Sequence, residues 1–163
     1  MSTSAVASGA DANAARQVLT FSLGEESYGI DILQVQEIRG WAPVTHIPQS
    51  PAHVLGVLNL RGSIVPIVDL RVRFALPAEF TPLTVIIVIS IQTPTGRKEC
   101  GLVVDSVSDV VDLEASQMRP APVLNGSATA GCIDGLATLD DRMLILLNVD
   151  DLLGSDLPAS RAA

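Results

Sequence analysis

Residues 56–69 read GVLNLRGSIVPIVD, two short apolar runs joined by the dipeptide Arg61-Gly62. Both runs are rich in Val, Ile and Leu, and a two-residue joint that contains glycine is typical of a tight hairpin between two strands. We therefore expect strands at Gly56 to Leu60 and at Ser63 to Val68. Asp69 is a favoured residue at the start of a helix, and it predicts a short helix directly after the second strand.

Short apolar runs of the same kind recur along the chain, broken by Gly, Pro, Asn and Asp, which is typical of an all-β domain. Further strands are expected at Val18 to Leu23, Tyr28 to Ile32, Val35 to Arg39, Val85 to Ile91, Glu99 to Val104 and Met143 to Leu147. Leu33 and Val35 have the opposite alternation to Ile30 and Ile32, so a bulge or a single helical turn is expected there. Ser50-Pro51 is a typical helix start and predicts a second short helix.

The second half of the chain repeats the plan of the first half. Gly101 falls on Gly29, which lies 72 residues earlier, and the apolar residues around the two glycines then coincide. Gly135 falls on Gly56 with an offset of 79 residues, and the capping residue Asp69 is then matched by an asparagine. Two β-meanders can look alike by chance, but the joint coincidence of glycine, apolar and capping positions favours a true internal repeat.

The repeat predicts an all-β fold of two five-stranded barrels, related by a pseudo-twofold axis, with a few short helices and a groove between the barrels. The expected single domain covers residues 17–154, with the first barrel at roughly 17–80 and the second at roughly 83–154, and strand exchange between them is left open. Residues 1–16 and 155–163 contain no apolar periodicity and are expected to be disordered tails.

The composition excludes several classes of partner. The 163-residue chain has a formal net charge of -8, so nucleic acid and anionic membranes are not expected to bind, because both require a basic surface. The apolar run at Val85 to Ile91 is too short to span a bilayer, and the N-terminus lacks the pattern of a signal peptide. Cys100 and Cys132 are expected to be reduced thiols in the cytoplasm.

No catalytic or metal-binding pattern is recognised in the sequence. His46 and His53 are seven residues apart without a carboxylate at ligand spacing, so no zinc site is expected. The paired acids Asp140-Asp141 and Asp150-Asp151 fall in a predicted hairpin turn and at a helix start, where acids are structurally favoured. A small acidic hydrolase that uses the paired aspartates is an alternative, but neither an enzyme nor a cofactor is expected.

Several stretches of the chain are together very similar to the CheW family of chemotaxis coupling proteins. They follow one another in the family's order, and they are residues 28–40, 56–71, 103–110, 118–122 and 141–147. The resemblance covers roughly residues 17–154. It implies two intertwined, SH3-like β-barrel subdomains of five strands each, which agrees with the repeat, and it implies an adaptor without catalytic activity.

The resemblance also implies the partners. Members of the family bind the cytoplasmic tip of chemoreceptors (methyl-accepting chemotaxis proteins) and the regulatory domain of the histidine kinase CheA, in membrane-associated signalling arrays. The receptor site implied for this chain is an apolar groove between the barrels, formed by Ile32, Val35, Glu37, Ile38, Gly56, Arg61, Gly62 and Val104. Glu37 and Arg61 are expected to form an ion pair, which their spacing alone leaves open. Arg119 and Leu124 fall where a kinase or ring contact is expected.

The sequence leaves other functions of such a fold open. The chain could be the same kind of module in another chemosensory pathway, or a fragment of the kinase's own regulatory region. A generic SH3-like binder of proline-rich peptides would need an aromatic groove, and the chain has one Trp, one Tyr and three Phe.

Overall fold

The structure is a computed structural model, and it describes residues 16–49, 51–93, 96–120, 133–139 and 142–153. The strands in this part of the chain are β1 (Arg16–Leu23), β2 (Glu26–Asp31), β3 (Val35–Gly40), β4 (Val54–Leu60), β5 (Ser63–Asp69), β6 (Val85–Thr93), β7 (Gly96–Val104), β8 (Ser106–Leu113), β9 (Met118–Arg119), β10 (Ile133–Leu139) and β11 (Arg142–Leu147). The helical turns are η1 (Ile32–Gln34), α2 (Leu70–Arg73), η2 (Ala115–Gln117) and α3 (Val149–Leu153). The predicted tails lie outside the described residues, except that β1 begins at Arg16.

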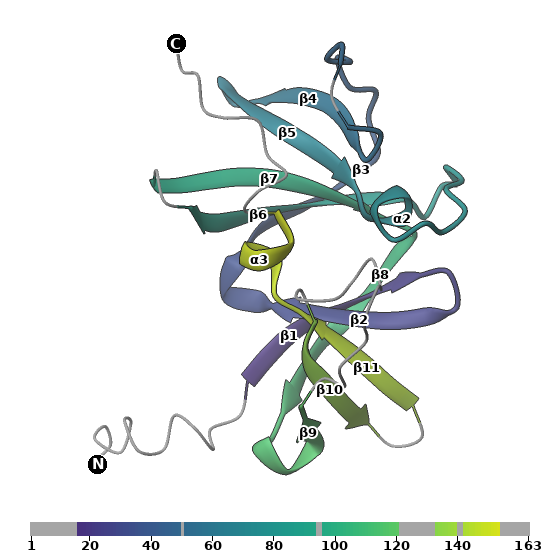
Figure 1. The fold of residues 1–163 in the computed structure, drawn as a ribbon, viewed down its shortest axis with the longest axis vertical. Helices are drawn as coiled ribbons and strands as arrows, with labels where there is room; N and C mark the ends of the chain where they lie inside the picture. The colour runs from purple at the N-terminus through teal and green to yellow at the C-terminus, as the bar shows by residue number, and fades with distance from the viewer. Residues whose placement is uncertain (1–15, 50, 94–95, 121–132, 140–141, 154–163) are drawn as a thin grey trace.

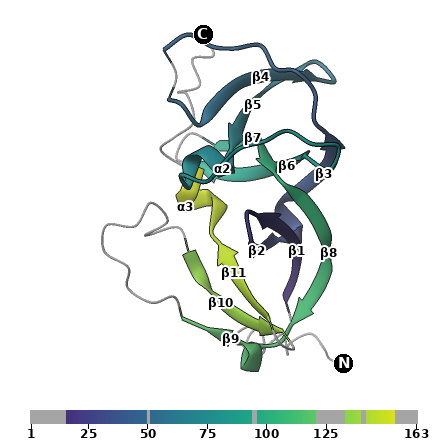
Figure 2. The same ribbon diagram turned by 90° about the vertical axis from the view of Figure 1, so that its right-hand side faces the viewer.

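The strands form two sheets, which lie one above the other in Figure 1. The lower sheet has the order β8-β1-β2-β11-β10-β9, and the upper sheet has the order β3-β6-β7-β5-β4. The chain passes to the upper sheet at η1 and returns at Asp105, between β7 and β8. Figure 2 shows β8 descending from the level of the upper sheet along the side of the lower one. The predicted all-β class, with two intertwined subdomains and a few short helices, is confirmed.

The internal repeat is confirmed by the strand pairing. Each sheet contains one parallel pair, in which Gly101 lies opposite Ile67 and Gly29 lies opposite Leu146. Register shifts occur at corresponding places in the β4–β5 and β10–β11 hairpins, and again in the β3–β6 and β1–β8 pairs. Because a bulge produces such a shift, the two halves share one topology down to the positions of their bulges. η1 and the bulge in β3 account for the break in alternation after Ile32.

Among the described residues, three apolar clusters form the core. The largest fills the space between the sheets, and each sheet has a smaller cluster of its own. In β6, Ile87 and Ile89 belong to the shared cluster, whereas Ile86 and Val88 belong to the cluster of the upper sheet. Alternate residues of a strand point to opposite faces, so β6 is buried on both faces. Full burial of one such side chain stabilises the fold by about 1.5–3 kcal/mol, so the shared cluster is a major term holding the sheets together.

The β4–β5 hairpin has the tight turn that its sequence predicts. Arg61 and Gly62 have φ values of 53° and 89°, and positive φ at both central residues matches the twist of the flanking strands. The Gly62 N–H donates to Asn59 Oδ1 at 2.9 Å. Asp69 caps α2 as expected, because its Oδ1 accepts a hydrogen bond from the Arg71 N–H at 2.9 Å.

The helix predicted to start at Ser50-Pro51 is wrong. Residues 52 and 53 form a turn, in which the Val54 N–H donates to the Pro51 carbonyl at 2.9 Å, and β4 begins at Val54. Val54 is buried and lies opposite Val68 of β5. Strand pairing of a β-branched residue therefore prevails here over the local helix signal.

Candidate functional site

The outer strands of the upper sheet meet through charged side chains. β3 and β4 lie at opposite ends of the sheet order, yet Arg61 at the β4–β5 turn places Nη1 2.7 Å from Oε1 of Glu37 on β3. Arg39 Nη1 lies 3.3 Å from the other oxygen of the same carboxylate. The ion pair that the resemblance implied is therefore present, and it brings the two ends of the upper sheet together.

Glu37, Arg39 and Arg61 form a surface cluster in which the Glu37 carboxylate accepts from both arginines. The hydrogen bond from Arg61 holds the pKa of Glu37 below its ordinary value of 4.5, and the charge of Arg39 acts in the same direction. The Glu37 side chain is 25% exposed, whereas that of Arg61 is 70% exposed. Because a guanidinium has five N–H donors, Arg61 can bond to Glu37 and still present donors to a partner. The ionised Glu37 carboxylate therefore holds the positively charged Arg61 guanidinium in place at the surface.

The bulge in β3 separates apolar and charged residues onto opposite faces. Across β6, Val35 and Ile38 lie opposite residues of the shared cluster, whereas Glu37 lies opposite a residue of the upper sheet's own cluster. Residues paired across a ladder share a face, so Val35 and Ile38 face the lower sheet and Glu37 faces away from it. Val35 is half-buried, and Ile38 is 44% exposed. Ile32 in η1 is half-buried against the same shared cluster.

Two of the predicted receptor residues do not lie on the surface. Val104 is 0% exposed in the shared cluster, so the prediction that it lines a groove is corrected: β7 is buried on both faces at its end, and Val104 can act only by packing. Gly56 is also buried, and a Cβ there would lie 2.1 Å from the Thr45 carbonyl oxygen. This close approach lets Thr45 bridge to Val57 of β4. Gly62 is exposed at the hairpin turn.

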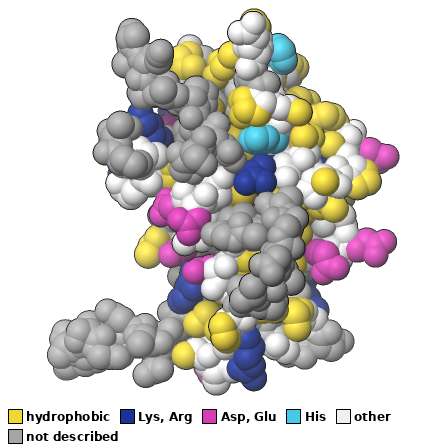
Figure 3. Space-filling model, viewed as in Figure 1, with side chains coloured by type: hydrophobic (Ala, Val, Ile, Leu, Met, Phe, Trp, Pro, Cys, Tyr) yellow, Lys and Arg dark blue, Asp and Glu magenta, His cyan; other side chains and the backbone are white. Residues whose placement is uncertain are grey.

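A hollow of about 440 Å³ lies where η1, β6, β7 and the start of α3 meet. Its charged lining residues are Arg16, Asp31, Arg97, Asp134 and Asp150. Ile32 borders a neighbouring hollow of about 250 Å³. The lining of the larger hollow is mainly polar, and none of the residues expected to form the apolar receptor groove belongs to it. Figure 3 shows acidic side chains at mid-height on both flanks, near the level at which the sheets meet.

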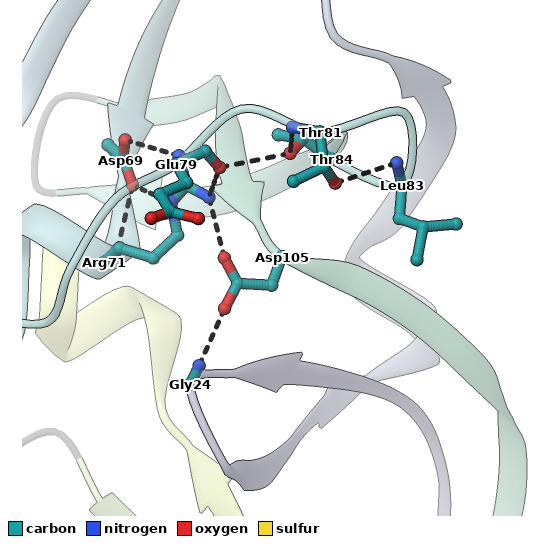
Figure 4. A network of polar contacts seen from close by, with 8 residues as sticks. All are labelled: Gly24, Asp69, Arg71, Glu79, Thr81, Leu83, Thr84 and Asp105. Atoms are coloured by element: carbon teal, nitrogen blue, oxygen red, sulfur yellow. Dashed lines mark hydrogen bonds and ion pairs between the residues drawn. The ribbon is translucent and has the colours of Figure 1, made fainter.

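A buried charged cluster beside α2 was missed by sequence reasoning (Figure 4). The Arg71 side chain is 0% exposed, with Nε 2.6 Å from Asp69 Oδ1 and Nη1 2.7 Å from Asp105 Oδ1. Nη1 also donates to the Glu79 carbonyl at 2.9 Å, and the guanidinium carbon lies 5.0 Å from the centre of the Phe80 ring. Burial alone would lower the pKa of Arg71, but the hydrogen bonds and charges of the two aspartates outweigh burial and raise it. Arg71 therefore stays charged inside the protein.

Asp105 connects this cluster to the lower sheet. Its second carboxylate oxygen accepts a hydrogen bond from the Gly24 N–H, in the β1–β2 turn, at 2.7 Å. Asp105 and Arg71 are 34 residues apart, so no local pattern in the sequence marks them as partners. The available signal is weaker: Asp69 and Arg71 flank an apolar residue in an otherwise apolar segment, where an unpaired charge would be costly.

The remaining predicted positions are only partly described by the structure. Arg119 is exposed on β9, and its Nη1 donates to the carbonyls of Ser116 and Met118 at 3.2 and 3.3 Å. Leu124 and the pair Asp140-Asp141 lie outside the described residues. Over the residues that are described, no group of three or more His, Cys, Asp or Glu could hold a metal ion. In the same part of the chain no helix is long and apolar enough to cross a membrane.

Comparison with known proteins gives one consistent family. Residues 17–157 match the model of the CheW-like domain. The chain is 48% identical over 142 residues to the chemotaxis protein CheW of Klebsiella aerogenes, which covers 86% of this chain and 83% of that protein. It is 38% identical over 138 residues to a probable chemotaxis protein CheW of Rhizobium etli, covering 84% and 86%. The crystal structure of the scaffolding protein TtCheW from Thermoanaerobacter tengcongensis superposes with a TM-score of 0.75 at 30% identity, covering 87% of this chain and 97% of that one.

Proposed function

This chain belongs to the CheW-like domain family, and we propose that it is a non-catalytic scaffold that couples chemoreceptors to the histidine kinase CheA. The observation that carries the proposal is the family match over residues 17–157, which includes nearly all of the described fold. The Klebsiella relative is named a chemotaxis protein, and the Thermoanaerobacter neighbour is described as a scaffolding protein. A scaffold works by binding alone and requires no cofactor. We place it in the cytoplasm, recruited to membrane-associated receptor arrays.

The proposed receptor surface is β3 together with the tip of the β4–β5 hairpin. Its apolar area comes from half-buried and exposed aliphatic residues, namely Ile32, Val35 and Ile38. β3 is the edge strand of the upper sheet, so a helical receptor tip along this edge can bury these side chains on one face of β3 while the Glu37–Arg61 pair on the other face sets its register. Gly62 forms the turn that carries Arg61, whereas the buried Gly56 and Val104 can contribute only by packing within the fold.

We propose that the kinase, or a neighbouring subunit in a ring, is contacted elsewhere, through Arg119 and Leu124. Arg119 is exposed on β9 of the lower sheet, whereas the proposed receptor surface belongs to the upper sheet. Separate surfaces would let one scaffold molecule hold both partners at once, which is what coupling requires.

Reconstitution with receptor-containing membranes and the kinase tests this function. We expect the chain to co-sediment with the membranes and to raise kinase autophosphorylation. Arg61→Glu places two like charges beside each other at Glu37, and we expect at least tenfold weaker recovery with receptors. Arg142→Glu makes the same charge change at an exposed position of the lower sheet, and its recovery with receptors should match that of the wild type.

Circular dichroism of each variant separates folding from binding. A folded Arg61→Glu variant that has lost receptor recovery supports the proposal. Wild-type protein that binds neither the membranes nor the kinase would contradict the coupling function. An unfolded Arg61→Glu variant would make the charge cluster structural instead.

A further inference from the structure

The two places where the chain passes between the sheets are equivalent in the repeat. The first crossover is η1, between β2 and β3, and the second is Asp105, between β7 and β8. Each crossover is bonded to a short helix, α3 for the first and α2 for the second. Each is also linked to a hairpin: Gln34 Nε2 of the first donates to the Ser90 carbonyl of β6 at 3.4 Å, and Asp105 of the second accepts from the Gly24 N–H of the β1–β2 turn. The same places in the fold therefore carry two sets of contacts that can be compared directly.

At the second crossover a charged and fully buried donor, Arg71, reaches the crossover residue Asp105, whose own side chain is 32% exposed. Arg71 Nη1 lies 2.7 Å from one oxygen of Asp105, and the Gly24 N–H donates to the other at 2.7 Å. The side chains of Arg71 and Asp69 are 0% and 1% exposed. Removing one partner from such a cluster is strongly destabilising, because the remaining charge is left uncompensated in the interior. The second crossover is therefore firmly held.

At the first crossover the contacts are weaker. The offset of 79 residues places Asp150 of α3 at the position of Arg71, and the strand pairing places Gln92 at the position of Gly24. Asp150 Oδ1 accepts hydrogen bonds from Gln34 Nε2 and from the Gln92 N–H, both at 3.2 Å. Both donors are neutral amides, and all three side chains border the hollow of about 440 Å³.

We propose that Asp150 is a positioning residue that sets the place of η1, and that the first crossover is the adjustable joint between the sheets. η1 carries Ile32, a proposed receptor contact, and Leu33, whose side chain is 85% exposed. Hydrogen bonds from neutral donors to a partly exposed carboxylate stabilise less than the buried cluster does. A partner bound at η1 can therefore shift it while the second crossover stays in place. The inference rests on the proposed function only where it names the receptor as that partner.

Hydrogen exchange of the full-length chain, followed by NMR without any partner, tests the role of Asp150. Asp150→Ala removes the acceptor, and the Gln92 amide should exchange about tenfold faster, which corresponds to about 1.4 kcal/mol. Asp150→Asn keeps an oxygen at this place, so exchange at Gln92 should stay close to the wild-type rate. Asp151→Ala changes the next, exposed residue and serves as the matched control.

A double-mutant cycle makes the test sharper. Gln34→Ala removes a donor instead of the acceptor, and its effect combined with Asp150→Ala should be less than additive, because the two side chains bond to each other. Unchanged exchange at Gln92 in Asp150→Ala would overturn the proposal, and so would fully additive effects. If Asp150→Ala does not fold, the comparison is made between Gln34→Ala and the wild type. Faster exchange of the Gln92 amide in Gln34→Ala then supports the proposal, and equal rates overturn it.

Co-sedimentation with receptor-containing membranes tests the consequence for binding. We expect Asp150→Ala to lower receptor recovery severalfold, Asp150→Asn to restore it, and kinase binding to stay unchanged in both. Unchanged recovery alongside faster exchange at Gln92 would overturn the positioning role. If the wild-type chain does not bind the membranes, the proposed function fails, while the exchange rates still decide whether Asp150 holds the first crossover.

Discussion

The upper and lower sheets follow one plan but are held by different polar contacts. Glu37 on β3 and Asp109 on β8 occupy equivalent positions beside equivalent bulges. Glu37 pairs with Arg61 at the tip of a hairpin, whereas Asp109 accepts a hydrogen bond at 2.8 Å from Thr20 of the neighbouring strand β1. The same contrast holds for the short helices, where the position of Arg71 in α2 is taken by an aspartate in α3.

Apolar positions, in contrast, are kept even where they are exposed. Ile38 is 44% exposed, and its equivalent Val110 is 47% exposed; Ile64 and its equivalent Met143 are 62% and 53% exposed. The comparison teaches that the topology depends on glycine and apolar positions, which both halves retain. Charged contacts have diverged, and the lower sheet also has a further strand, β9, where the upper sheet has the isolated bridge between Thr45 and Val57.

The largest expected effect is on the buried cluster of the second crossover. Arg71→Met should lower the free energy of unfolding by about 3–5 kcal/mol, because Asp69 and Asp105 lose their buried counter-charge. Urea denaturation followed by circular dichroism measures this loss. Arg16→Met removes an exposed ion pair at 3.6 Å and should cost only about 0–1 kcal/mol. Equal losses of unfolding free energy in the two variants would mean that the buried ion pairs of Arg71 stabilise the fold no more than the exposed ion pair of Arg16.

The next largest effect compares two equivalent glycines. A Cβ at Gly56 would lie 2.1 Å from the Thr45 carbonyl oxygen at a φ of 151°, whereas a Cβ at Gly135 would lie 2.8 Å from the Arg119 carbonyl oxygen. Gly56→Ala should therefore destabilise the fold by about 2–4 kcal/mol and Gly135→Ala by about 1–2 kcal/mol. Thermal unfolding of both variants measures the difference. A larger loss of stability in Gly135→Ala than in Gly56→Ala would mean that the upper sheet accommodates an added Cβ better than the lower sheet does.

The smallest effect concerns the charge cluster on β3. Because the pKa of Glu37 is lowered in the folded state, its ion pair stabilises the protein above the pKa of the unfolded chain and is lost as pH falls through the folded pKa, below 4.5. NMR titration of the carboxyl carbon should give a pKa below 4.5 in the wild type. Arg61→Met should raise that pKa toward the ordinary value, although Arg39 remains. An unchanged pKa would show that Arg61 does not hold Glu37 in solution.

The sequence predicts those parts of the fold that have local causes. The β4–β5 hairpin follows from two short apolar runs and a glycine turn, and the capping role of Asp69 follows from residue type alone. The same local signals fail at Pro51, where pairing with a distant strand decides the structure. Val104 was placed in the groove by the family resemblance, and a strand buried on both faces shows no alternation that would have revealed its burial.

The candidate site is less predictable, because its contacts join distant parts of the chain. The Glu37–Arg61 pair was expected from the family resemblance, and the spacing of the two residues alone left it open. Nothing local links Arg71 to Asp105, and the polar lining of the hollow depends on how the two sheets are placed. Side-chain pairing across a crossover is a property of the assembled fold, so a single sequence contains little signal for it.

The sheet order also dictates when each part of the protein can be completed during synthesis. The upper sheet is formed by the continuous run from β3 to β7, so all its strands are present once Val104 has left the ribosome. β1 and β2 are made first, but they pair with β8 and β11, which are made much later. At roughly 5–20 residues per second, β11 follows β2 by on the order of ten seconds. For that time the first hairpin presents Phe21 and Tyr28 without their final neighbours, which makes the beginning of the chain the segment that chaperones have most reason to protect.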